Sequence, residues 1–252
     1  MLSKQVTKIV QNLEKKKFRE KYNLFKIEGE KLVGELLHSP LKIHSLIAFP
    51  SWLEQNKKAL SNVNIIEADE REMHGISNFQ SLPEVIALAE IPVHIYRKEE
   101  ILDSLSLVLN GIQDPGNLGT IIRLADWFGI EHIFCSNNTV DAFNPKTIQA
   151  TMGAIARVKL HYCSLYELIS NLKDVPVYGT FLDGEDIYTQ KLSSNGLIIM
   201  GNEGNGISQE VEQLINKRLY IPNYPQSRET SESLNVAIAT AIVCSEFRRQ
   251  AL

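Results

Sequence analysis

Apolar positions along the first third of the chain follow two helical patterns and then three strand-like runs. The helical patterns cover about residues 4–20 and 29–38, and the strand-like runs lie at 45–49, 63–67 and 84–91. Alternating strands and helices of this size predict a small α/β domain.

The alternation restarts after a polar stretch at residues 97–100. Strand patterns follow at 105–109, 131–135, 175–179 and 196–200, and helix patterns at 118–128, 144–152, 165–172 and 233–250. We therefore expect one domain over residues 1–96, a linker over 97–104 and a second α/β domain over 105–252.

The last predicted helix is apolar almost all round from Val236 to Cys244. Such a helix is buried on most of its sides. It needs either a deep position within its own domain or a partner subunit.

Three predicted strands end in loops rich in glycine, asparagine and other polar residues. These loops cover residues 110–119, 201–206 and 221–235. In open α/β sheets, ligands bind at the carboxyl ends of the strands, and glycine lets the backbone approach a ligand closely. The sequence therefore predicts that the three loops converge on one ligand pocket.

Common motifs for nucleotides, metals and hydrolysis do not fit these loops. Gly201, Gly204 and Gly206 have the spacing GxxGxG rather than GxGxxG, and Asn117 stands where a P-loop has lysine. The six histidines are isolated in the sequence, so we assign them no role and expect no metal. No GxSxG elbow is present.

Single residues in these loops have both structural and functional interpretations. Arg123 lies well away from the apolar stripe of its predicted helix. It is either an exposed arginine that pairs with Asp126, or a side chain at the mouth of the first loop that faces a phosphate or an attacking hydroxyl. Likewise, Asn117 and Glu203 could be turn residues and Ser233 a helix cap.

Composition places the chain among ordinary globular proteins. Of its 252 residues, 44% are hydrophobic and 22% charged. The basic, amphipathic first residues do not resemble a secretory signal, and no apolar run is long enough to span a membrane. Three widely spaced cysteines form no disulfide framework, so we expect a cytoplasmic protein without a membrane partner.

Charge is distributed unevenly along the chain. Residues 1–34 carry nine Lys and Arg against four Glu, whereas the rest carries 17 basic and 26 acidic residues. A basic arm on an acidic body fits a polyanionic partner. The alternative is that Lys15, Lys16, Lys17, Arg19 and Lys21 form a solvated helix face.

Taken together, the three loops resemble the signatures of the SpoU/TrmH family of RNA ribose 2′-O-methyltransferases, in the SPOUT superfamily. The first signature is VLNGIQDPGNLGTIIRLADWFGI at 108–130, the second LIIMGNEGNGIS at 197–208, and the third covers 219–250. Residues 141–158 are similar to the region between the first two signatures, and the first third resembles the substrate-binding domain of many members. Two positions depart from the pattern, Gln149 in place of a frequent arginine and a long loop at 223–232.

The resemblance implies a C-terminal SPOUT domain with a parallel sheet and a deep trefoil knot, preceded by a small α/β RNA-binding domain. It implies S-adenosylmethionine as cofactor and a homodimer through the C-terminal domain, with the last helix at the interface. The partner it implies is structured RNA, with ribosomal RNA favoured over transfer RNA.

The resemblance also implies roles for individual residues. The catalytic centre would contain Arg123, Asn117, Ser233, Asn235 and Glu203, and the cofactor would be contacted by Gly201, Asn202, Gly204, Ile221, Pro222 and Leu234. The expected reaction is in-line displacement, in which a ribose 2′-hydroxyl attacks the sulfonium methyl without a metal. Because a guanidinium stays protonated at neutral pH, we favour an Arg123 that grips phosphate and stabilises the alkoxide over one that acts as a base.

Two other interpretations remain open. A non-catalytic RNA-binding relative would keep the fold without binding the cofactor, and the complete set of signature polar residues argues against it. An unrelated nucleotide-using α/β enzyme would carry one of the common fingerprints, which are absent.

Overall fold

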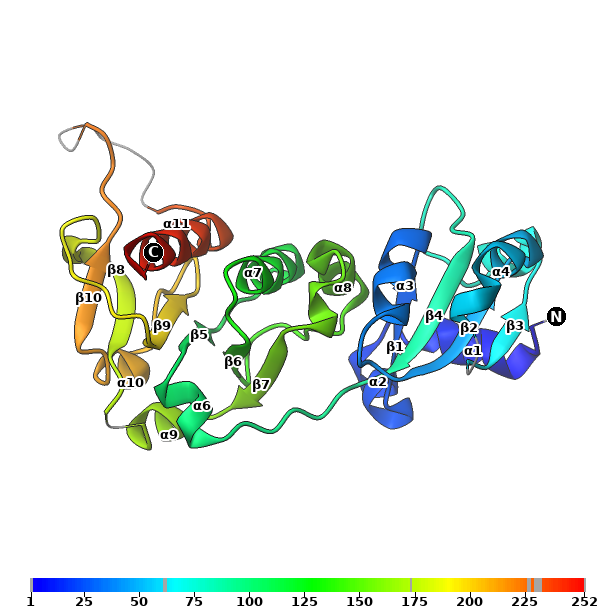
Figure 1. Cartoon of the computed structure of the whole chain (residues 1–252), viewed down its shortest axis with the longest axis horizontal. Helices are drawn as coiled ribbons and strands as arrows, with labels where there is room; N and C mark the ends of the chain where they lie inside the picture. Colours follow the sequence, from blue (N-terminus) through cyan, green and yellow to red (C-terminus); the bar gives the residue numbers. More distant parts are fainter. Residues whose placement is uncertain (1, 61–62, 173, 226–227, 229–232, 252) are drawn as a thin grey trace. The chain divides into compact units, whose positions relative to one another are not determined.

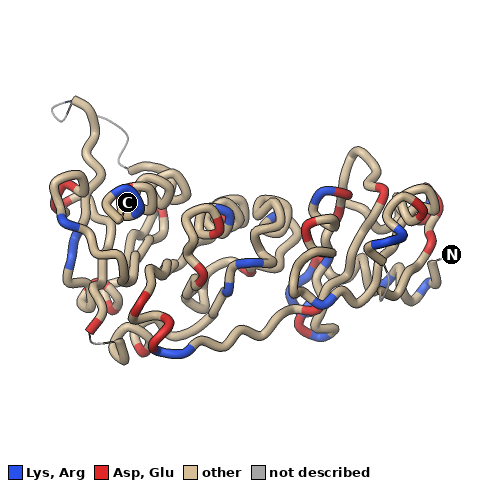
Figure 2. Tube along the Cα trace, in the orientation of Figure 1, with Lys and Arg blue, Asp and Glu red and all other residues tan. Residues whose placement is uncertain are grey.

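The computed structural model describes residues 2–60, 63–172, 174–225, 228 and 233–251. It divides into two compact units, which Figure 1 shows. One contains Met1–Val93 and Asp141–Arg157, and the other contains His94–Val140 and Val158–Leu252. Along the chain, acidic and basic residues are interspersed in both units (Figure 2). No helix of the described residues is long and apolar enough to cross a membrane.

The first unit is built on a four-stranded sheet in the order β1-β4-β2-β3. Its strands are β1 (Leu24–Glu28), β2 (Ile43–Ala48), β3 (Ile65–Glu67) and β4 (Val85–Glu90). Its helices are α1 (Lys4–Asn12), α2 (Lys16–Tyr22), α3 (Glu30–Leu37), α4 (Pro50–Asn56), α5 (Glu70–His74) and α8 (Pro145–Thr151). Strand β4 pairs antiparallel with β1 and β2, whereas β3 runs parallel to β2. The small α/β domain expected from the sequence is therefore present.

The single helix expected over residues 4–20 is two helices, α1 and α2. At the break, the carbonyl of Leu13, the C-cap of α1, accepts a hydrogen bond from Nη1 of Arg19 at 2.6 Å. Leu13 is fully buried there, and the Arg19 side chain is 3% exposed. Arg19 thus belongs to neither a solvated basic face nor an RNA-binding one.

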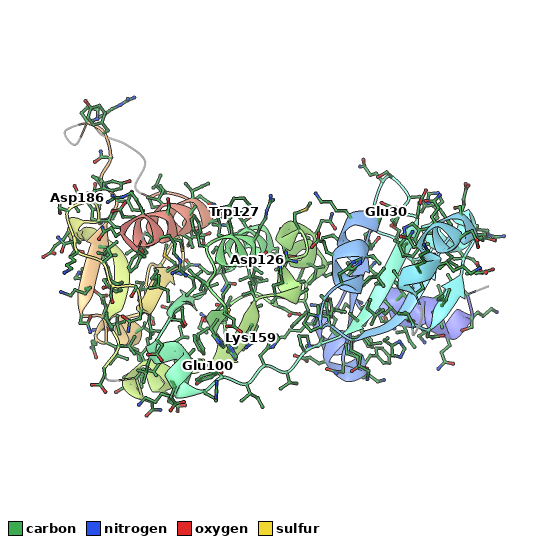
Figure 3. The ribbon with its side chains drawn as sticks, in the orientation of Figure 1. Glu30, Glu100, Asp126, Trp127, Lys159 and Asp186 are labelled. Carbon is green, nitrogen blue, oxygen red and sulfur yellow. The ribbon has the colours of Figure 1, made fainter. Side chains whose placement is uncertain are left out.

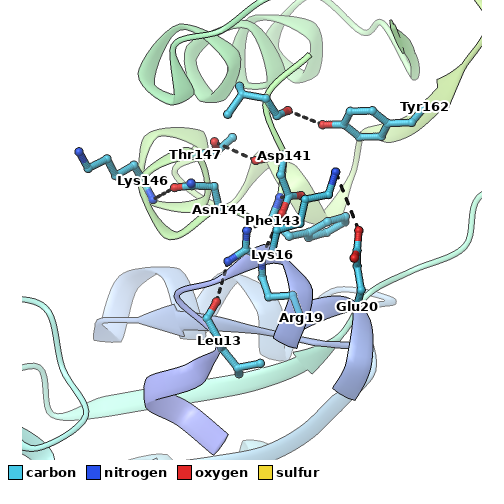
Figure 4. A network of polar contacts seen from close by, with 11 residues as sticks. Leu13, Lys16, Arg19, Glu20, Asp141, Phe143, Asn144, Lys146, Thr147 and Tyr162 are labelled. Carbon is cyan, nitrogen blue, oxygen red and sulfur yellow. Dashed lines mark hydrogen bonds and ion pairs between the residues drawn. The ribbon is translucent and has the colours of Figure 1, made fainter. Parts of the chain in front are cut away.

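The segment 141–157 packs within the first unit although it follows β6 of the second (Figure 4). Nη2 and Nε of Arg19 donate to Oδ2 of Asp141 at 2.5 and 3.0 Å. The rings of Phe25 and Phe143 lie 4.9 Å apart. If the segment left the first unit, Arg19 would be a buried charge without its partner, which is strongly destabilising. The ion pair of Arg19 and Asp141 therefore holds the segment in place.

The second unit is built on a six-stranded sheet in the order β10-β8-β9-β5-β6-β7. Its strands are β5 (Leu105–Asn110), β6 (His132–Ser136), β7 (Lys159–Cys163), β8 (Val177–Asp186), β9 (Gly196–Gly201) and β10 (Lys217–Tyr220). All neighbouring pairs are parallel, which confirms the predicted parallel sheet. The trefoil knot stays a prediction, as do the boundaries 1–96, 97–104 and 105–252.

Helices cover the parallel sheet on both faces (Figure 1). They are α6 (Lys98–Leu102), α7 (Pro115–Trp127), α9 (Leu165–Ser170), α10 (Gln209–Glu212) and α11 (Val236–Ala251). Apolar residues of α9 pack with Val108, Phe134 and Leu197, which are fully buried. Strands buried on both faces explain the mostly apolar runs at 105–109 and 196–200, in which even the polar Ser106 is buried.

Helix α11 is buried along one face only. Val243 and Phe247 are buried, whereas Ile238 is 55% exposed and Ile242 is half-buried. Trp127, at the end of α7 (Figure 3), is 83% exposed. Within one chain, then, the all-round apolar sequence of α11 leaves an uncovered apolar face.

Three of the histidines that are isolated in the sequence lie together in the folded chain. Nδ1 of His132 and Nε2 of His161 are 3.1 Å apart, and the ring of His94 packs edge-on against His161. Burial and the neighbouring His132 and His94 lower the pKa of His161 to about 4, and burial also lowers the pKa values of His132 and His94. The described residues contain no group able to hold a metal ion.

This cluster predicts a sensitivity to acid. An unfolded histidine titrates near pH 6.5, above the folded value for His161, so the unfolded state binds protons first. The contribution of His161 to the free energy of unfolding should therefore be fully present above about pH 6.5 and be lost progressively toward pH 4. His161→Gln should lose less stability than wild type between pH 7 and 5 in denaturant titrations. The exposed control His74→Gln should follow wild type, and an equal pH dependence in all three would contradict the assignment.

Candidate functional site

The parallel sheet brings the predicted loops to one edge, because the carboxyl ends of parallel strands lie together. The loops after β5 and β9 are joined directly by hydrogen bonds. Nδ2 of Asn202 donates to the carbonyl of Gly111 at 2.8 Å. The backbone N–H of Ser208 donates to Oδ1 of Asn110 at 2.6 Å. The first and second loops therefore form one connected rim.

Asn117 links all three loops through its side-chain amide. Nδ2 of Asn117 donates to Oε1 of Glu203 at 2.5 Å, and Oδ1 of Asn117 accepts from Nδ2 of Asn235 at 2.9 Å. Oδ1 of Asn235 in turn accepts from the backbone N–H of Ala237, at the start of α11. Three predicted catalytic residues from distant parts of the sequence thus lie in one hydrogen-bonded chain.

Asn117 itself is held by a helix cap. Oδ1 of Asp114 accepts from the backbone N–H of Asn117 at 2.7 Å, and Pro115 occupies the first position of α7. This is the usual way to satisfy a free N–H at a helix start. The sequence DPGN at 114–117 therefore fixes the position of the Asn117 backbone in the first turn of α7, from which its side chain extends.

A cavity of about 450 Å³ lies beside this hydrogen-bonded chain. Its walls come from the middle of β8, from the ends of β9 and β10 and the residues that follow them, and from the start of α11. Among the predicted site residues, the cavity is lined by Gly201, Asn202, Glu203, Gly204, Ile221, Ser233 and Leu234. Asn117 contacts Glu203, and Asn235 contacts Asn117, but neither asparagine lines the cavity. Pro222 does not line it either.

Arg123 is not brought to the cavity within one chain. It is exposed on α7, away from the buried face that contains Leu118 and Ile122. Its catalytic role stays a prediction. Residues 226–227 and 229–232 of the long loop at 223–232 lie outside the described residues.

The turn after β9 is closed by its own backbone. Asn202 and Gly206 exchange two hydrogen bonds of 2.9 and 3.0 Å, and Oδ1 of Asn202 accepts from the N–H groups of Gly204 and Asn205. At Gly201, a Cβ would lie 2.5 Å from the carbonyl carbon of Gly206. Glycine is therefore required at 201 so that the turn can fold back along the cavity.

Sequence reasoning missed one wall of the cavity, which the middle of β8 provides. Thr180, Phe181 and Leu182 line it together with Tyr220. The signal was present, since Gly179 and Gly184 bracket this stretch directly after the apolar strand run.

The site can bind a ligand that is partly apolar and partly hydrogen-bonding. Its walls combine apolar side chains such as Met200 and Ile207 with the backbone of a glycine turn. A volume of this order suits a small organic molecule. S-adenosylmethionine, which has an apolar and a polar part, fits such a lining. The residues that would hold it are those of the turn after β9 and of the stretches at 221 and 233–234.

A parallel sheet with a cavity at the carboxyl ends of its strands defines an α/β ligand-binding domain. The model of the SpoU rRNA methylase family matches residues 104–245, and that of the MRM3-like substrate binding domain matches residues 4–87. The chain belongs to the SpoU rRNA methylase family.

Curated and solved relatives agree with this family. The 23S rRNA (guanosine(2553)-2′-O)-methyltransferase RlmP of Bacillus subtilis is 32% identical over 245 residues, which are 94% of this chain and 93% of that protein. A TrmH-family structure from Porphyromonas gingivalis is 38% identical, with a TM-score of 0.88 and 99% of both chains covered. An AdoMet-bound rRNA methyltransferase from Sinorhizobium meliloti is 29% identical, with a TM-score of 0.87, covering 100% of this chain and 97% of that one.

Alanine substitution at Gly201 and at Gly204 should change the stability of the fold by different amounts. Gly201→Ala places a methyl against the Gly206 backbone and should destabilise the fold by about 1–3 kcal/mol, as overpacking does. At Gly204 the nearest atom to a new Cβ is Oδ1 of Asn202 at 3.5 Å, so Gly204→Ala should change stability by less than about 0.5 kcal/mol. Denaturant unfolding of both variants measures this difference, and equal stabilities would refute the close approach at 201.

Proposed function

We propose that this chain transfers a methyl group from S-adenosylmethionine to a ribose 2′-hydroxyl of structured RNA, with ribosomal RNA favoured over transfer RNA. Membership of the SpoU rRNA methylase family and the rRNA methyltransferases among its relatives support this function. The observation that carries it is that the second and third loops line one cavity, while the first loop is joined to both of them through the Asn117 amide.

The cofactor supplies a methyl group that its positive sulfur already activates. The protein therefore has to orient the two reactants and assist loss of the hydroxyl proton. The backbone turn Gly201–Gly206 and Leu234 hold the cofactor, while Asn117, Glu203 and Asn235 fix the loops around it.

Arg123 grips an RNA phosphate and stabilises the negative charge that develops on the 2′-oxygen. A guanidinium suits this role because it stays charged and offers a planar set of donors. Ser233 lines the cavity and relays the hydroxyl proton.

The N-terminal part of the first unit, residues 1–93, recognises the RNA. Its match to a substrate binding domain over residues 4–87 supports this assignment. Helix α2 exposes Lys16, Lys17 and Lys21, which suit phosphate contacts, whereas Arg19 is committed to Asp141. We assign this role to residues 1–96, the linker to 97–104 and catalysis to 105–252.

Two copies associate through the C-terminal domain. The uncovered apolar face of α11, with Ile238 and Ile242, and the exposed Trp127 support such an interface. We further propose that the chain is threaded as a trefoil knot. A cytoplasmic location, where ribosomal RNA is modified, fits the three free cysteines.

The enzymatic proposal predicts methyl incorporation from labelled S-adenosylmethionine into ribosomal RNA that lacks the modification. Arg123→Ala should lower kcat by about 10²-fold or more, because it removes a group that stabilises developing charge. Arg123→Lys should restore only part of the rate, since lysine lacks the planar fork. Calorimetric S-adenosylmethionine binding should be unchanged in both variants. Absence of cofactor binding by wild type would favour a non-catalytic RNA-binding protein instead.

The interface proposal predicts that Ile238→Glu shifts the protein toward monomers in sedimentation equilibrium, because a charge would be buried at an apolar contact. Tyr188→Glu is a matched control on the same unit, since Tyr188 is 52% exposed against 55% for Ile238. A wild-type monomer, or equal dissociation of both variants, would contradict the assignment.

A further inference from the structure

Strand β8 departs from both of its neighbours beside the cavity. Its register with β9 ends at Gly179, which pairs with Ile199. On β10, Arg218 is opposite Gly179, but the next residue, Leu219, is opposite Glu185. Residues 180–184 therefore have no partner on either strand. We call this stretch the β8 bulge, and its first three residues line the cavity.

Glycines at both ends allow the bulge to leave and rejoin the sheet. A Cβ at Gly179 would lie 2.5 Å from Cδ1 of Ile215 and 2.7 Å from Cε2 of Phe181. A Cβ at Gly184 would lie 2.6 Å from the carbonyl carbon of Leu219. The aromatic ring of Phe181 thus occupies the space that a side chain at 179 would fill.

One side chain of β10 contacts the bulge twice. The guanidinium carbon of Arg218 lies 3.5 Å from the centroid of the Phe181 ring. Nη2 of Arg218 donates to Oδ1 of Asp183 at 2.6 Å, and Nη1 donates to Oε1 of Glu212 at 2.7 Å. Glu212 lies on α10, so Arg218 connects the bulge to an element outside it.

These contacts require an arginine. Stacking on a ring and forking between two carboxylates both use the planar guanidinium, and lysine offers neither. The hydrogen bonds raise the pKa of Arg218 and lower the pKa of Asp183, so both groups stay charged. An isolated exposed ion pair contributes little to stability. Arg218 differs from such a pair because its guanidinium also stacks on the ring of Phe181.

We propose that Arg218 is a positioning residue for the cofactor site, which it never touches. It is not among the residues that line the cavity, and it holds Phe181 and the β8 bulge in the position where they form one wall. This inference rests on the proposed function, because the ligand of that wall is S-adenosylmethionine.

The test is calorimetric binding of S-adenosylmethionine and of S-adenosylhomocysteine to the full chain, without RNA. Arg218→Ala should raise the Kd of both ligands about tenfold, which corresponds to about 1.4 kcal/mol. Arg218→Lys should resemble Arg218→Ala, because it keeps the charge and loses the planar fork. Lys217→Ala is the matched control, an exposed cation at the adjacent position of β10, and should bind as wild type does.

A second readout separates positioning from general damage. In methyl transfer, KM for S-adenosylmethionine should rise in Arg218→Ala while kcat at saturation stays within about twofold of wild type. If Arg218→Ala lacks a wild-type circular dichroism spectrum, Arg218→Lys and Arg218→Gln carry the same comparison.

The inference is overturned if folded Arg218 variants bind both ligands with the wild-type Kd, or if Lys217→Ala weakens binding equally. A loss of kcat with unchanged KM would also overturn it. A wild-type protein that binds neither ligand would instead refute the proposed function.

Discussion

The amide of Asn117 is the contact on which the arrangement of the site depends. It donates to Glu203 and accepts from Asn235, so one side chain joins three loops that are far apart in sequence. A carboxylate offers only acceptors and an ammonium only donors, whereas an amide offers both. The order of partners also fixes which end of the amide faces which loop. The cavity wall formed by Glu203 and the start of α11 follows from this pair of hydrogen bonds.

The parallel sheet is what makes this contact possible. Strands β5, β9 and β10 run in the same direction, so their following loops share one edge although about 90 residues separate the first two. Glycine at 201 then lets the second loop fold against itself, and the β8 bulge supplies a further wall. Binding would therefore rely on backbone geometry and apolar surface more than on charged side chains.

The first unit is not built from the first part of the chain alone. Residues 141–157 pack within it through the buried pair of Arg19 and Asp141 and the rings of Phe25 and Phe143. Any truncation that removes the N-terminal residues would leave Asp141 and Phe143 without these partners. Point variants are consequently the sounder way to separate RNA recognition from catalysis.

Periodicity predicted most of the regular elements, because strands buried on both faces and one-sided helices leave strong apolar patterns. It missed the break between α1 and α2, because residues 13–15 contain no glycine or proline and the Leu13 carbonyl finds its partner in the Arg19 side chain. It missed β7, and it missed the histidine cluster because His132 on β6 and His161 on β7 meet only when those two strands pair. The loops of the site were found from composition, and their roles came from the family resemblance. The β8 bulge was overlooked because the two glycines that bracket it, Gly179 and Gly184, do not by themselves indicate a change of strand register.

The position of the transferred methyl group tests the central claim most directly. Ribosomal RNA methylated with labelled S-adenosylmethionine can be hydrolysed with alkali, which requires a free 2′-hydroxyl at the cleaved linkage. If the cavity presents the cofactor to a ribose, the label will appear in alkali-resistant dinucleotides. Label confined to ordinary mononucleotides would place the methyl on a base and contradict the account.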